Sequence, residues 1–170
     1  MGKGEMKRGF LIFILASLMS FSSIGKEYYN LWLEQEVLDE YADKPAGVVL
    51  EFRGGDGKWK WVTPMIESYV KQIRAKYPDL PIDVVAHGSG IKSLTEDSMY
   101  KFSSSTQDSL ESLSKEGVDI SVCGAKSAMM KIPLDSYAKY IYVAESAPQL
   151  IRDLIRQDEY VHILLGDKSW

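Results

Sequence analysis

Short β-branched and aromatic runs alternate with helical patterns along most of this chain, and this alternation constrains its fold more than any other feature. Strands separated by helices pair in parallel through right-handed crossovers. Several runs are apolar at successive positions, as at Val84 and Val85, which suits strands covered on both faces. We therefore predict an α/β fold, a three-layer sandwich of Rossmann or flavodoxin-like type around a five-stranded, mostly parallel sheet. The predicted strands are residues 46–52, 82–87, 118–123, 140–144 and 160–165.

Helical periodicity fills the stretches between these strands. An apolar stripe predicts a helix over residues 64–77, with Pro64 in its first turn. The sparser stripe of residues 95–116 predicts two helical pieces, because the serines at 103–105 interrupt it. Short helices are predicted over 125–131 and over 147–156, the second capped by Ser146. The Gly- and Trp-rich residues 54–61 are predicted to form a connection, either as a solvated loop or with Trp59 or Trp61 covering a site or a subunit contact.

The first 25 residues have the pattern of a secretory signal peptide. Basic residues precede a mostly apolar run at 10–21, and small residues follow it up to Gly25. A retained N-terminal membrane anchor is the alternative, because the length of the apolar run lies near the boundary between the two. Cleavage after Gly25 leaves residues 26–45 as an N-terminal extension and 46–170 as one α/β domain. We therefore expect a periplasmic protein that meets a membrane only through an uncleaved signal segment.

Charge and cysteine content narrow the possible partners. The net charge of -4 gives no attraction to a polyanion, so no nucleic-acid partner is expected. Cys123 is the single cysteine, so the exported chain forms no internal disulfide, and its thiol is either inert, paired between chains or kept for reactivity. A single cysteine and two histidines do not complete an ordinary structural zinc site without carboxylates and a neighbouring subunit, so no metal is predicted. No cofactor is predicted either.

Cys123 and His87 each close a predicted strand. Ligands of parallel sheets gather beyond the carboxyl ends of the strands, so both residues are candidates for a site there. Their strand ends are about 5 Å apart if the second and third strands are neighbours, and about 10 Å apart if the first strand lies between them. His87 has a second interpretation, as a histidine that closes the loop by a hydrogen bond to backbone. His162 lies inside the last strand, on a face of the sheet, and is interpreted as structural.

The residues after Cys123 favour a reactive sulfur. Gly124 and a helix that begins near Ala125 place unpaired backbone N–H groups and the positive end of a helix dipole beside the thiol, which stabilises thiolate. Lys126 or a protonated His87 would add to this effect. Gly124 also lets a partner or substrate approach the backbone closely. Serine hydrolysis is rejected, because the residues around Ser89 lack the G-x-S-x-G pattern.

Two short segments in this order resemble the DsrE/DsrF-like family, including its exported members. They are His87-Gly88-Ser89-Gly90 and the run GVDISVCG at 117–124, and the resemblance covers about residues 46–165. It implies a YchN-like fold, assembly into homo-oligomers, and sulfur carried as a persulfide on Cys123. Cys123 and His87 are then the candidate catalytic residues. The candidate substrate-binding residues are Gly88, Ser89, Gly124 and Lys126.

Two functions follow as expectations. The first is an exported sulfur carrier or sulfurtransferase, in which Cys123 is the nucleophile, Gly124 N–H and Lys126 assist it, and His87 tunes ionisation or moves a proton. Its partners would be a sulfur donor or acceptor protein or a small thiol. The alternative is a non-catalytic module of the same fold that binds a small ligand or a protein, with Cys123 serving only packing. Redox sensing through a Cys123 disulfide between chains also stays open.

Overall fold

The computed structural model describes residues 44–55, 57–99 and 104–165 of the chain. The predicted signal peptide and nearly all of the predicted extension at 26–45 therefore lie outside the described residues. In chain order the elements are β1 (Val48–Arg53), α2 (Trp59–Lys76), β2 (Ile82–His87), the 3-10 helix η1 (Ser89–Leu94), α3 (Glu96–Met99), α4 (Ser104–Lys115), β3 (Val118–Cys123), α5 (Gly124–Met129), the 3-10 helix η2 (Leu134–Ser136), β4 (Ile141–Ala144), α6 (Ala147–Arg156) and β5 (Val161–Leu165).

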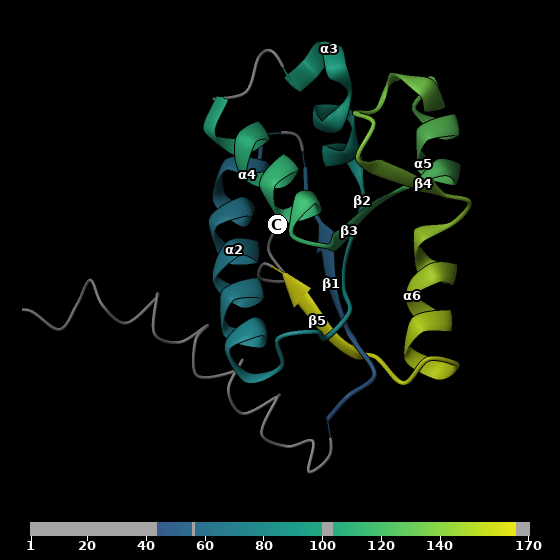
Figure 1. Cartoon of the computed structure of the whole chain (residues 1–170). Coiled ribbons are helices and arrows are strands. Elements are labelled where there is room, and N and C mark those ends of the chain that lie inside the picture. Colours follow the sequence, from purple (N-terminus) through teal and green to yellow (C-terminus); the bar gives the residue numbers. More distant parts are fainter. Residues whose placement is uncertain (1–43, 56, 100–103, 166–170) are drawn as a thin grey trace, which may run out of the picture. The chain divides into compact units, whose positions relative to one another are not determined.

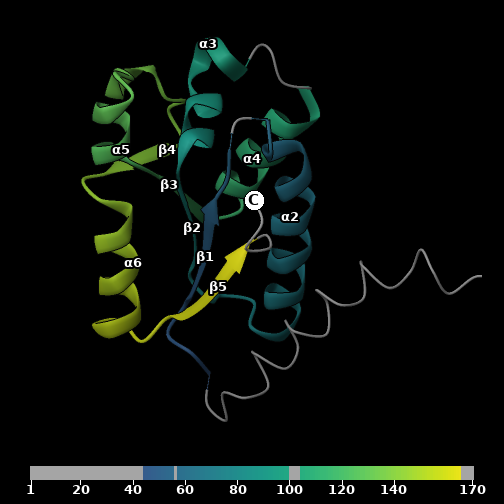
Figure 2. The same ribbon diagram turned by 180° about the vertical axis from the view of Figure 1, so that it is seen from behind.

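The strands form one sheet of five in the order β4-β3-β2-β1-β5. All four pairs of neighbouring strands are parallel. Helices α2 and α4 lie on one side of this sheet, and α5 and α6 lie on the other (Figures 1 and 2). The predicted α/β sandwich with a parallel sheet is therefore confirmed.

The two faces of the sheet differ in chemistry. Residues in register on parallel neighbours share a face, so alternate residues of each strand sort into two sets. On the α2 and α4 side, the residues of β1, β2 and β3 are apolar and no more than 1% exposed: Val48, Leu50, Phe52, Ile82, Val84, Ala86, Val118, Ile120 and Val122. The set on the α6 side includes polar residues: Glu51, Asp83, His87, Asp119, Ser121 and His162. Polar chemistry therefore concentrates on the α6 face.

Helix α2 begins at Trp59, five residues before the predicted start, so Pro64 lies inside the helix rather than in its first turn. Tertiary contacts explain the early start. Trp59 is 1% exposed, packs edge-on against Phe52 with ring centroids 4.8 Å apart, and donates its indole N–H to Gly90 O at 3.0 Å. These contacts hold the helix in place before the proline. Trp61, by contrast, is 60% exposed.

The other predicted helices are found close to their expected bounds. The stretch 95–116 forms two pieces, α3 and α4, and residues 100–103 between them lie outside the described part. Ser146 occupies the position before α6, but its side chain makes no capping hydrogen bond. Within the described ranges, no helix combines the length and apolar character needed to cross a membrane.

Candidate functional site

The structure brings the strand ends of Cys123 and His87 together. Strands β2 and β3 are neighbours, and Ala86 pairs with Val122 in their register. His87 and Cys123 follow directly, so their backbones leave the sheet at adjacent positions about 5 Å apart. Of the two separations that the sequence left open, the shorter one holds.

Backbone N–H groups from two helices point at the sulfur of Cys123. Lys126 N donates to Cys123 Sγ at 3.4 Å, and Ala147 N donates to it at 3.5 Å. Lys126 lies in the first turn of α5, and Ala147 is the first residue of α6. The prediction that backbone amides would face this sulfur is confirmed. Lys126 contributes its backbone N–H rather than its side chain. Ala147 N is the second donor, in place of the Gly124 N–H that was expected. The sequence did not reveal Ala147, because it lies 24 residues away.

Cys123 is a buried residue, with little of its surface accessible to solvent. The residue is 5% exposed and belongs to an apolar cluster between the sheet and α6. Cys123 therefore packs among apolar side chains while its sulfur accepts from two backbone amides. The buried members of the cluster are Val49, Val85, Cys123, Ala147, Ile151 and Leu154.

Helix α5 is fixed to the strand end by a buried hydroxyl chain. Ser127 Oγ donates to Cys123 O at 2.9 Å and shares a hydrogen bond of 2.8 Å with Tyr137 OH. Burial raises the pKa of Tyr137, the negative charge of a Cys123 thiolate raises it further, and the Ser127 bond opposes both. Tyr137 therefore stays protonated at neutral pH and supports α5 as a neutral hydrogen-bonding group.

His87 turns toward β1 rather than toward the sulfur. Its Nε2 lies 2.6 Å from Glu51 Oε1, and among the described residues it has no hydrogen bond to Cys123. The adjacent strand ends therefore do not bring the imidazole and the thiol into a hydrogen bond with each other. The alternative interpretation of His87, a hydrogen bond to backbone, is not what the structure shows either, since its partner is a carboxylate side chain.

Glu51 is a charged residue of the candidate site that the sequence did not reveal. It is 2% exposed, and its carboxylate binds His87, His162 Nε2 at 2.6 Å and Arg53 Nε at 2.5 Å. Burial by itself raises the pKa of Glu51, but hydrogen bonds from Arg53 and His87, the Arg53 charge and the His162 bond together lower it to about 2. The signal was a single carboxylate within the apolar strand run of residues 46–52. His162 lies on a face of the sheet as expected, on the same face as His87.

The glycines of the His87-Gly88-Ser89-Gly90 segment have a packing role in this fold. Gly90 N donates to Gly54 O at 2.9 Å, which brings the turn after β2 against the turn after β1. A Cβ on Gly88 would lie 2.9 Å from Gly54 O, and Gly88 has a φ of 92° that disfavours other residues. Ser89 beside them is exposed.

Gly124 is likewise needed for close packing. A Cβ on this residue would lie 2.9 Å from Ala144 O. The end of β4 and the connection to α6 therefore occupy the space beside Gly124 where a partner or substrate was predicted to approach. This connection is also what brings Ala147 to the sulfur, because Ala125 N donates to Glu145 O at 2.9 Å.

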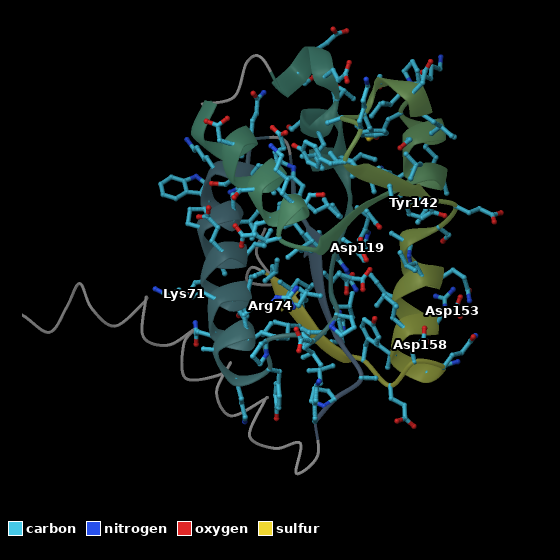
Figure 3. The ribbon with its side chains drawn as sticks, viewed as in Figure 1. Lys71, Arg74, Asp119, Tyr142, Asp153 and Asp158 are labelled. Atoms are coloured by element: carbon cyan, nitrogen blue, oxygen red, sulfur yellow. The ribbon has the colours of Figure 1, made fainter. Side chains whose placement is uncertain are left out.

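Three acidic residues gather at the other end of the same sheet face. Asp83 pairs with Asp119 across β2 and β3, and Figure 3 shows Asp119 on the sheet with Asp158 near the end of α6. Burial, together with the charges of Asp119 and Asp158, raises the pKa of Asp83 to about 6. Within the described residues, no group of three or more His, Cys, Asp or Glu side chains is arranged to hold a metal ion.

We expect Asp83→Asn to stabilise the protein at pH values above the Asp83 pKa. Folding raises the pKa of Asp83 from 3.8 to about 6, so the folded state binds the proton more tightly. The stability linked to Asp83 is therefore fully present below pH 3.8 and is lost as the pH rises through about 6. The variant should gain about 1 to 2 kcal/mol at about pH 7.5 and little at about pH 4, measured by urea unfolding. Equal gains at both pH values would show that the charge of Asp83 is not the cause.

Comparisons with known proteins support the fold and do not indicate an activity. No family model matches the chain, and no curated protein matches it. Among solved structures, the chain is similar to the protein of unknown function MTH1491 from Methanobacterium thermoautotrophicum, with a TM-score of 0.54 and 19% sequence identity. The match covers 69% of this chain and 98% of that one. Likeness at this identity supports the α/β fold alone.

Proposed function

We propose that this protein is an exported, homo-oligomeric member of the DsrE/DsrF-like family that carries sulfur as a persulfide on Cys123. The family and its export are supported by the sequence segments at 87–90 and 117–124 and by the signal-peptide pattern of residues 1–25. Sulfur would arrive from a persulfide donor, either a protein or a small thiol, and would leave to a second thiol.

The observation that carries the proposal is the pair of N–H groups on Cys123 Sγ. Lys126 N and Ala147 N donate to the sulfur from the first turns of α5 and α6. Donors at helix N-termini stabilise negative charge. A thiolate before loading and a persulfide anion after it both carry that charge on sulfur, so one arrangement serves both states.

The loading step is a sulfur transfer between thiols. The Cys123 thiolate attacks the outer sulfur of a persulfide R–S–SH, a new S–S bond forms on Cys123, the donor S–S bond breaks, and the donor leaves as the thiolate RS⁻. No external oxidant or reductant takes part, because the outer sulfur only changes its carrier. In unloading, an acceptor thiolate attacks the same outer sulfur and Cys123 is released as a thiolate.

The test is loading of the native full chain with glutathione persulfide near neutral pH, followed by mass spectrometry. We expect Cys123 to gain one sulfur atom faster than the chain unfolds, with the unfolding rate measured separately under the same conditions. Cyanide should then remove the outer sulfur as thiocyanate and restore the original mass. The chain unfolded in urea serves as the control for an unassisted thiol, and Cys123→Ser as the control for sulfur bound elsewhere.

Loading no faster than unfolding would overturn the proposal, because Cys123 would then react only when the fold opens. The burial of Cys123 supports a second candidate function for that outcome. At 5% exposure within an apolar cluster, the residue has the environment of a packing side chain. The protein would then be a non-catalytic module that binds a small ligand or a protein, and Cys123→Ala would leave that binding unchanged.

A further inference from the structure

The Glu51 cluster has a buried base and an accessible rim. The Glu51 side chain is 2% exposed, whereas its partners His87, His162 and Arg53 are 18%, 33% and 61% exposed. Three nitrogen-bearing side chains are thus partly exposed on the α6 face, and all three hydrogen-bond to one buried carboxylate. Arg53 and His87 also end β1 and β2, at the carboxyl edge where ligands of parallel sheets gather.

The charge of Glu51 determines which ring nitrogens remain available. With its pKa lowered to about 2, the Glu51 carboxylate is ionised at neutral pH and only accepts hydrogen bonds. Both imidazoles must therefore donate N–H from Nε2, which prevents these nitrogens from ligating a metal. In each ring Nδ1 is left, and it becomes an N–H donor only when the ring takes up a proton. Arg53 uses Nε for Glu51, and its terminal nitrogens bond no other described residue.

The charges of the cluster balance until an imidazole is protonated. Arg53 offsets Glu51, so with both rings neutral the net charge of the cluster is zero, and one added proton makes the cluster positive and adds one N–H donor on an imidazole. We propose that His87, His162 and Arg53, held by Glu51, bind a small tetrahedral oxyanion of the sulfate or phosphate type together with a proton. Such an anion accepts from the paired guanidinium N–H groups and from the protonated ring at once. This site is separate from the sulfur chemistry of Cys123.

Other ionisable groups lie on the same side of the sheet. Their effect on the pH dependence of anion binding must be distinguished from that of the imidazoles. Helices α2 and α4 lie on the opposite side (Figures 1 and 2), so their charges do not face the cluster. Asp83 matters most, because its pKa is raised to about 6, so its charge changes within the pH range of the test. The charged and titratable groups on the elements around the two rings are Glu51, Arg53, Asp83, Lys92, Asp119, Cys123, Arg152, Asp153, Arg156, Asp158, Glu159 and Tyr160.

The test is a calorimetric titration of the full chain with sulfate at constant ionic strength between about pH 8 and about pH 6. Sulfate stays doubly charged over this range, so a pH-dependent affinity reports on the protein. We expect the affinity to rise with falling pH, by up to tenfold per pH unit, because one proton is bound together with the anion. Arg53→Gln should lower the affinity about tenfold, while Arg152→Gln, the same change at an exposed site on α6, should leave it unchanged.

Asp83→Asn separates the imidazoles from the nearby carboxylate. If the imidazole rings bind the anion, Asp83→Asn keeps the pH dependence of the sulfate affinity. His162→Gln should reduce that pH dependence. Equal binding of chloride and sulfate, an unchanged affinity in Arg53→Gln, or loss of the pH dependence in Asp83→Asn would each overturn the proposal and leave Glu51 as a structural ion-pair centre. Phosphate serves as the second probe, and failure with both anions has the same meaning.

Discussion

Replacement of Trp59 with alanine is expected to lower the free energy of unfolding by about 4 kcal/mol, the range for removing a fully buried aromatic side chain. Trp59 is 1% exposed and packs edge-on against Phe52 at 4.8 Å. Its indole N–H also satisfies Gly90 O at 3.0 Å, so the substitution leaves a cavity and a buried carbonyl without its donor. Guanidinium unfolding followed by circular dichroism measures the change.

Trp61 provides the matched control two positions away. It is 60% exposed, so Trp61→Ala should change the free energy of unfolding by no more than about 0.5 kcal/mol. Trp59→Phe separates packing from hydrogen bonding, since it keeps an aromatic ring but removes the donor to Gly90 O, and should lose about 1 to 2 kcal/mol. Similar losses for Trp59→Ala and Trp61→Ala would contradict the assignment of Trp59 as the anchor of α2.

The second large effect is expected for Gly90→Ala. A Cβ on Gly90 would lie 2.8 Å from Gly54 O and 2.9 Å from Gly55 O, and both atoms belong to backbone that cannot rotate away. The turns after β1 and β2 must then separate and stretch the hydrogen bond from Gly90 N to Gly54 O. We expect a loss of about 2 to 4 kcal/mol in thermal or denaturant unfolding.

Gly55→Ala is the control for Gly90→Ala. A Cβ on Gly55 would meet only Ser89 Oγ at 3.8 Å, an ordinary contact, so its effect should stay within about 0.5 kcal/mol. A small effect at Gly90 as well would show that the two turns are not held together as closely as this geometry requires. Because Arg53 and His87 lie next to these turns, Gly90→Ala should also weaken sulfate binding at the Glu51 cluster.

The candidate sites were predictable to different degrees. The position of Cys123 before α5 followed from sequence, because a strand end, a glycine and a helix start are local features. The adjacency of the Cys123 and His87 strands needed the strand order, and the contact of His87 with Glu51 needed the register between β1 and β2. Ala147 as a donor to the sulfur depended on the path from β4 to α6.

The start of α2 shows the same division between local and distant causes. Periodicity located the helix, and the rule that proline favours the first turn placed its start at Pro64. The contacts of Trp59 with Phe52 and Gly90 extended it back to Trp59. Local rules set where a helix can form, and distant packing set where this one begins.

The sequence by itself determined the parallel α/β architecture and the strand ends that hold Cys123 and His87, because periodicity reports burial among residues close along the chain. Only the tertiary structure decided that Glu51 collects both histidines, from positions 36 and 111 residues away, and that the sulfur meets an amide of α6. Such partners lie on different strands and helices. Strand order and register decide which of these residues come into contact, and neither can be predicted from a local sequence pattern.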